Sequence, residues 1–146
     1  MELTIEQALQ QGVAAHKEGK LEEAERLYRA ILQSQPTHSD ANHNLGVLAV
    51  SVNKVSEALP LFKAALNANP KVEQFWFSYI DALTKLGKLS EAKAVLDKAR
   101  EKGAKGEGFD NLEDRVRELR ASAELKTQNN EPTQDRLRPV MELHRQ

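Results

Sequence analysis

The chain has 146 residues, a formal net charge of −1, 40% hydrophobic residues and 29% charged residues, a balance that is typical of a globular protein. With so little net charge there is no overall field to attract phosphate backbones or anionic lipid, so we expect neither a nucleic acid nor a membrane partner. Cysteine is absent, which excludes disulfides and thiolate chemistry, and no apolar run reaches the roughly 18 residues that a membrane-spanning helix needs. The first residues also lack the basic-then-apolar layout of a signal peptide, so we expect a cytoplasmic protein.

The sequence repeats itself at a fixed interval. One column of the repeat holds Gly19, Asn53 and Gly87, which are equally spaced and tolerate a left-handed backbone. A second column holds three alanines with the same spacing, Ala24, Ala58 and Ala92. A fixed period of about 34 residues predicts an all-α array of helix–turn–helix units.

The first unit is expected at residues 4–36. Thr4 and Gln7 have the spacing of a capping box and should start a helix that runs to about residue 17. A turn at Gly19 follows, and a second helix begins at Leu21 with apolar residues at helical spacing. Pro36 should stop that helix, because proline disfavours helical geometry in the residue before it.

The next two units are expected at residues 39–70 and 73–104. In the second unit, helices at 39–51 and 55–68 should join at Asn53. One candidate for the amino-terminal cap of the second helix is Ser56. Pro60 would then lie just past the first turn, where it should be tolerated rather than break the helix. In the third unit, helices at 73–86 and 89–102 should join at Gly87.

The remainder of the chain is expected to contain two further helices. Residues 109–125 have a narrow apolar stripe suited to a capping helix that covers the open face of the third unit. Residues 126–132 are polar and predict a linker. Residues 133–146 resemble the first helix of a truncated further repeat, so we expect that the chain is the amino-terminal part of a longer protein.

The repeat resembles the tetratricopeptide repeat, whose signature is W-x2-L-G-x2-Y, then A-x3-F, then P. The second unit carries it most completely, as Asn42-x2-Leu45-Gly46-x2-Ala49, then Ala58-x3-Phe62, then Pro70. The resemblance covers residues 4 to about 104 and implies a right-handed superhelix. The amino-acid sequences of the repeats are also similar to those of the repeat arrays that precede catalytic domains in bacterial glycosyltransferases and sulfotransferases.

The sequence shows no catalytic constellation. His16, His38, His43 and His144 lack the paired spacing of a metal site, and the glycines near Gly103 do not form a phosphate loop. No nucleophile motif surrounds any serine. We therefore expect no enzyme activity, no cofactor and no metal in these residues.

The family resemblance implies that the first helices of the units line a concave groove that holds a peptide or helix of another protein. The groove positions carried over onto this chain are Leu9, Val13, His16, His43, Asn44, Val47, Val50, Phe77, Ser78, Asp81 and Thr84. One known version of the groove clamps chaperone tails with basic and amide side chains. Only Asn44 matches that set, so the resemblance does not extend to this specificity.

Two alternatives to a groove scaffold follow from the sequence. Residues 109–146 could join two copies of the chain, which would make the protein a self-association module. The chain could also be the amino-terminal regulatory or substrate-recruiting region of a bacterial transferase whose catalytic domain lies elsewhere.

Overall fold

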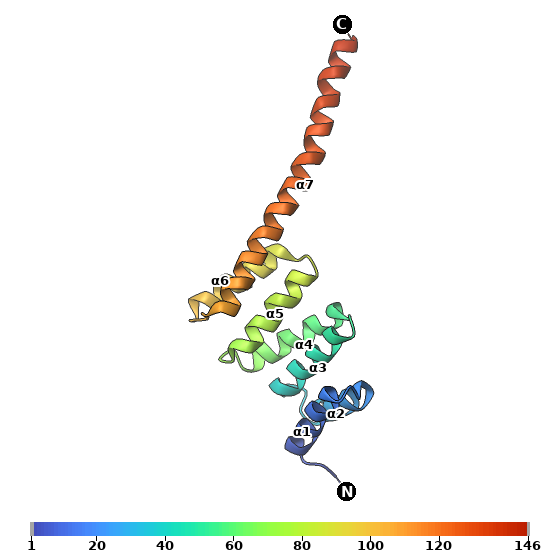
Figure 1. Cartoon of the computed structure of the whole chain (residues 1–146), viewed down its shortest axis with the longest axis vertical. Coiled ribbons are helices and arrows are strands. Elements are labelled where there is room, and N and C mark those ends of the chain that lie inside the picture. Colours follow the sequence, from blue (N-terminus) through green and yellow to red (C-terminus); the bar gives the residue numbers. More distant parts are fainter. Residues whose placement is uncertain (1, 146) are drawn as a thin grey trace.

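A computed structural model describes the backbone of residues 2–145 and the side chains of residues 2–126. The helices are α1 (Ile5–Lys17), α2 (Leu21–Ser34), α3 (Ser39–Ser51), α4 (Val55–Ala68), α5 (Glu73–Lys85), α6 (Leu89–Glu101) and α7 (Glu107–Arg145). Figure 1 shows α1 to α6 stacked as antiparallel pairs, with α7 leaving the stack at one end. Between residues 2 and 145 there is no strand, which confirms the prediction of an all-α helical-repeat fold. Within the described residues, none of the helices combines the length and the apolar character that crossing a membrane requires.

The helices follow the period of the sequence. The first helices of successive units begin at Ile5, Ser39 and Glu73, and α7 begins at Glu107, each one repeat period after the one before. Within each unit the two helices pack on one another, and the second helix also contacts the first helix of the next unit. The start of α7 therefore occupies the place that the first helix of a fourth unit would take.

The turns inside the units depend on a left-handed residue at one column. Gly19, Asn53 and Gly87 have φ angles of 81°, 63° and 74°. Glycine adopts this conformation without a steric penalty, and asparagine is among the few other residues that adopt it routinely. This column explains why the chain reverses direction after α1, α3 and α5.

Close packing inside the first two units depends on glycine in the first helix. A Cβ on Gly12 would lie 2.5 Å from Cε1 of Tyr28, and one on Gly46 would lie 2.5 Å from Cε1 of Phe62. These distances are far below van der Waals contact, so only glycine lets the aromatic ring of the second helix reach the first helix. The alanines at the repeat column in α2, α4 and α6 are all fully buried, namely Ala24, Ala58 and Ala92.

The start of α4 differs from the prediction in one detail. Its amino-terminal cap is Lys54 rather than Ser56, and no side chain bonds to the free amides of the first turn. Pro60 lies inside the helix, as expected, and is exposed. Because proline lacks an N–H, the turn loses one helical hydrogen bond but the helix continues.

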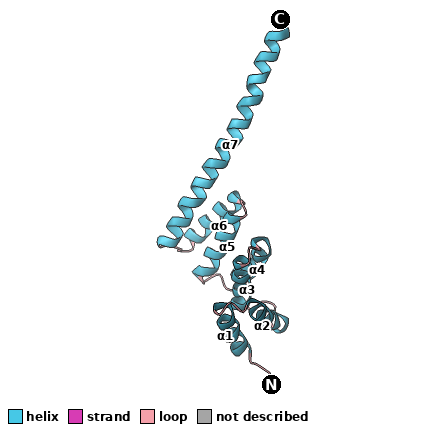
Figure 2. Cartoon of the chain, turned by 45° about the vertical axis from the view of Figure 1, so that its right-hand side comes forward, coloured by secondary structure: helices cyan, strands magenta, loops and turns pink. Residues whose placement is uncertain are grey.

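The carboxyl-terminal helix also differs from the prediction. Residues 126–132 are helical, so the expected linker and separate final helix are replaced by one helix, α7, of 39 residues. Ala121 occupies the column of Gly19, Asn53 and Gly87, and alanine disfavours the left-handed backbone of a turn. The helix therefore runs straight on where the earlier units reverse, as Figure 2 shows.

Candidate functional site

The first helices of the units form one continuous face of the stack. In the part of the chain that the structure describes, α1 contacts α3, α3 contacts α5 and α5 contacts α7, whereas the second helices α2, α4 and α6 have no direct contacts with one another. Helices that approach more closely on one side of a stack make that side the inner side of a curve. We call this surface, lined by α1, α3, α5 and the start of α7, the first-helix face.

Two of the expected groove residues are buried between units instead. His43 is 8% exposed and Ser78 is 9% exposed, and Nε2 of His43 lies 2.8 Å from the Ser78 hydroxyl. The imidazole also lies against the rings of Phe62 and Phe75, with centroid distances of 5.4 and 4.9 Å. His43 therefore joins the second unit to the third.

Burial also sets the charge of His43. Loss of solvent lowers the pKa of the imidazole, and this effect outweighs the opposite influence of Asn44 and Asp40. A buried ring with a lowered pKa is neutral near pH 7. Gln74 completes the arrangement by donating from Nε2 to the Ser78 hydroxyl over 3.2 Å.

Three apolar residues expected in the groove are half-buried against the core. Leu9 packs against the core between α1, α2 and α3, and Val50 packs against the larger core of the second and third units. Phe77 meets the ring of Phe109 edge-on, with centroids 5.8 Å apart. A large share of each side chain is therefore used to hold neighbouring helices together.

Two polar residues of α5 have partners within the stack. Thr84 is buried and donates its hydroxyl proton to the carbonyl oxygen of Ile80 over 2.8 Å. Asp81 is partly exposed and lies 2.9 Å from Nζ of Lys85 and 3.9 Å from Nη1 of Arg115 on α7. Asp81 therefore remains on the surface, and Thr84 does not.

Of the expected groove residues, Val47 is exposed, and Val13, His16, Asn44 and Asp81 are partly exposed, as are Leu9, Val50 and Phe77. Val47 is the most exposed large apolar residue among them, at 36%. The face is therefore a narrow apolar strip with a few polar points, because the burial of His43 and Ser78 removes its centre from solvent. Arg115 was not among the residues predicted for the groove, although its position one repeat period after Asp81 could have placed it beside that carboxylate.

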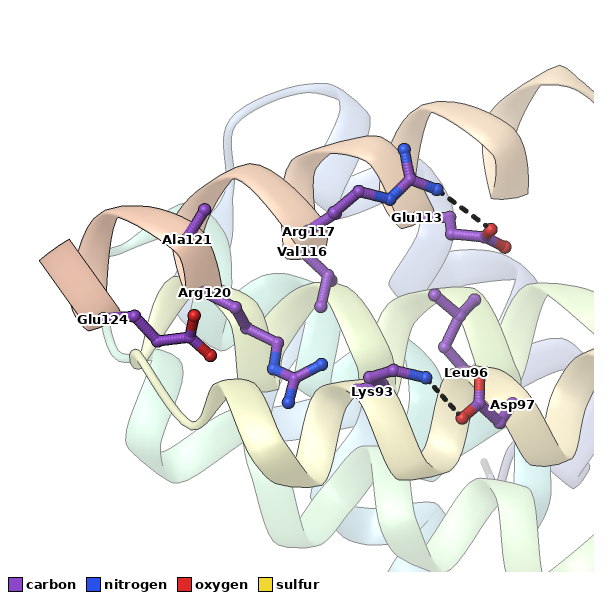
Figure 3. Close-up of a pocket in the computed structure, with 9 residues that line it drawn as sticks. All are labelled: Lys93, Leu96, Asp97, Glu113, Val116, Arg117, Arg120, Ala121 and Glu124. Atoms are coloured by element: carbon purple, nitrogen blue, oxygen red, sulfur yellow. Dashed lines mark hydrogen bonds and ion pairs between the residues drawn. The ribbon is translucent and has the colours of Figure 1, made fainter.

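A second surface feature lies between α6 and α7, at the carboxyl-terminal end of the stack. An open cavity of about 310 Å³ lies there, with Leu96 and Val116 on its floor. Figure 3 shows that ion pairs border it, with Lys93 bonded to Asp97 and Arg117 to Glu113. The charges around this cavity therefore neutralise one another.

The described side chains contain no group of three or more histidine, aspartate or glutamate residues that could hold a metal ion. No buried side-chain nitrogen or oxygen among them is without a hydrogen-bond partner. The Ser78 hydroxyl and the His43 imidazole lie within hydrogen-bond distance of each other, but both are buried between the second and third units rather than exposed on the first-helix face.

Comparison with known proteins agrees with this geometry. Residues 49–115 match the sequence model of the tetratricopeptide repeat family. No curated protein matches the chain in sequence.

Several solved structures have the same fold. The type III secretion chaperone SycD of Yersinia enterocolitica, solved with a peptide of the translocator YopD, is 24% identical with a TM-score of 0.67 and covers 87% of this chain and 97% of its own. The TPR2B domain of yeast Sti1, solved as a complex with pHsp70, is 17% identical with a TM-score of 0.71, covering 78% of this chain and 96% of its own. An O-GlcNAc transferase mutant of Thermobaculum terrenum is 24% identical with a TM-score of 0.61, and the match spans 69% of this chain but only 20% of the transferase.

Proposed function

Because this chain is a tetratricopeptide-repeat protein, we propose that it is a non-catalytic scaffold that binds a peptide or helix of a partner protein on its first-helix face. Proteins of this fold serve as protein-interaction scaffolds, and the SycD structure contains a bound peptide of the translocator YopD. On this chain we place the contact with the partner on the first-helix face.

Val47 carries the proposal. Its side chain is 36% exposed on α3, the central first helix, with Asn44 one turn away on the same helix. Val13 on the neighbouring α1 and Asp81 on α5 extend the accessible strip to both sides. An apolar strip with a few polar points suits the apolar side of a helix or the alternate side chains of an extended peptide.

Peptides selected from a random library on the full chain would test this surface. Val47→Asp should weaken binding of the selected peptides about tenfold or more, because a buried unpaired carboxylate costs at least the roughly 1.4 kcal/mol that corresponds to a factor of ten. Val52→Asp is the matched control, since Val52 is 41% exposed but lies at the α3–α4 turn. Isothermal titration of both variants, with circular dichroism to check their folds, gives the comparison.

The proposal is contradicted if the two variants do not differ in this direction. If both keep the affinity of the parent chain, or if only Val52→Asp loses it, the peptides do not bind at the first-helix face. A folded Val47→Asp variant is required for either conclusion, and the exposure of Val47 makes that outcome expected.

A second candidate function is self-association through α7. Leu119 and Leu125 of this helix are 36% and 59% exposed, and Leu119 continues the stripe of Leu112 and Val116. Light scattering of the full chain and of a chain that ends after Lys126 tests this candidate. A monomer in both cases at high concentration discards it.

A further inference from the structure

A cluster of unpaired positive charge lies on the side of the stack away from the first-helix face. An open cavity of about 390 Å³ is bordered by Lys63 of α4, by Lys98 of α6 and by Lys102, the residue that caps the carboxyl end of α6. The rings of Trp76 and Tyr79 from α5 line it as well. No aspartate or glutamate is among the residues that line it. We call this cavity the lysine pocket.

The aromatic wall of the lysine pocket is fixed in place. Trp76 is 7% exposed, and its indole Nε1 donates to the carbonyl oxygen of Pro70 over 2.7 Å. Pro70 lines the same cavity, so this bond joins two parts of its wall. Tyr79 is 9% exposed, so the two rings offer a small apolar surface, and because it is rigid it needs little ordering when a ligand binds.

The three lysines have no compensating charge among the described residues. None of them takes part in an ion pair there, whereas Lys93 of the same helix α6 lies 2.8 Å from Asp97. Lys98 and Lys102 also lie one helical turn apart, which places two like charges side by side on one helix face. Both lie at the carboxyl-terminal end of α6, where the helix dipole favours positive charge, so the helix accommodates these lysines without a carboxylate partner.

The earlier units show that the repeat itself does not require these charges. One repeat period earlier, the positions of Lys98 and Lys102 are occupied by Ala64 and Ala68. Lys63 corresponds to Arg29, whose Nε bonds to Glu25 over 2.8 Å. The residue that corresponds to Glu25 in the second unit is Leu59, which cannot pair with Lys63.

We propose that the lysine pocket binds an acidic segment of a partner protein, with carboxylates at the lysines and an apolar side chain against Trp76 and Tyr79. Lysine presents a compact charge on a flexible stem, which suits spaced carboxylates better than a single planar anion. The cavity volume lies at the lower end of the range of ligand pockets and accommodates one or two side chains. The net charge of −1 gives the chain no long-range attraction to the polyanionic surfaces of nucleic acids or membranes, so we favour a short acidic peptide.

The single tryptophan of the chain provides the measurement. Trp76 is the only tryptophan and lies in the pocket, so its fluorescence reports occupancy directly. The probe is a blocked hexapeptide of alternating aspartate and leucine, titrated into the full chain at low salt. The expected result is a saturable fluorescence change whose affinity falls as salt is added.

Charge-reversed variants locate the binding. Lys98→Glu with Lys102→Glu should weaken the aspartate–leucine peptide at least tenfold. Lys88→Glu with Lys105→Glu makes the same change in net charge at exposed lysines outside the pocket, and it should alter the affinity less than twofold. Thermal unfolding of both double variants shows whether they are folded.

Each of three outcomes would overturn the proposal. Equal weakening by the two double variants would mean a general charge effect without a pocket. Equal affinity for an all-aspartate hexapeptide or for inorganic phosphate would mean an anion site that does not use the aromatic wall. Equal affinity for a lysine–leucine peptide would remove the role of charge. The test does not depend on the first-helix face, because Val47→Asp leaves the lysine pocket unchanged and should bind the probe as the parent does.

Discussion

Gly46 of α3 lies so close to Phe62 of α4 that a Cβ on the glycine would be 2.5 Å from the ring. We therefore expect Gly46→Ala to lower the free energy of unfolding by about 1–3 kcal/mol, because overpacking a full core forces side chains and backbone to shift. Urea denaturation followed by circular dichroism measures the change.

Gly108→Ala is the control for this prediction. Its Cβ would lie 3.6 Å from the Phe77 ring, an ordinary contact, and the residue is within α7. Removing a helical glycine should leave stability unchanged or raise it by up to about 1 kcal/mol. If both glycine variants behave alike, close approach is not the reason for glycine at position 46.

Replacing Gly87 in the α5–α6 turn should also lower stability, but through its backbone conformation rather than through a clash. Gly87 has a φ of 74° and no atom within 4 Å of an added Cβ, so Gly87→Ala creates no clash. The left-handed backbone alone should cost about 1–2 kcal/mol. Asn53→Gly, at the same column, should change the free energy of unfolding by less than about 1 kcal/mol, and a larger loss there would show that the Asn53 side chain has a role of its own.

Burial of His43 predicts a dependence of stability on pH. Its pKa in the folded state is lowered below the value of about 6.5 in the unfolded chain, so acidification protonates the unfolded state first. The free energy of unfolding should therefore fall as the pH drops below about 6.5, by at most about 1.4 kcal/mol per pH unit from this residue, until the folded pKa is reached.

Comparing the parent chain with His43→Phe isolates this effect. Phenylalanine keeps a ring between Phe62 and Phe75, and Gln74 still bonds to Ser78. The free energy of unfolding, measured by denaturation at several pH values between 5 and 8, should depend less on pH in the variant than in the parent. An equal pH slope in the two proteins would mean that the protonation of His43 does not affect folding.

Phe109 anchors α7 to the third unit. The ring is 6% exposed, meets Phe77 edge-on and lies 5.9 Å beneath the guanidinium of Arg100. Phe109→Ala should cost about 3–5 kcal/mol, as other buried phenylalanines do. Leu125→Ala, at a side chain that is 59% exposed on the same helix, should stay within about 0.5 kcal/mol of the parent, and comparable losses would mean that α7 does not dock through Phe109.

The repeat period was sufficient to predict the six paired helices and their turns, because Gly19, Asn53 and Gly87 act through local backbone geometry. The prediction of a linker at 126–132 was wrong, because these residues are part of α7. Their polar composition does not prevent a helix, and no residue with a left-handed backbone ends the helix at Ala121. How deeply the expected groove residues are buried depends on tertiary packing, which the spacing along one helix does not determine. His43 and Ser78 lie on the expected helices, but the way that the third unit packs on the second buries them against each other, and spacing along one helix does not report that.

Ala121 has a consequence for how an array of this kind can change in length. At this position of the repeat the earlier units fold back as hairpins, whereas α7 continues as one helix, and Ala121 itself lines the α6–α7 cavity. Introducing a left-handed residue at this column is therefore the first step needed to add a fourth hairpin.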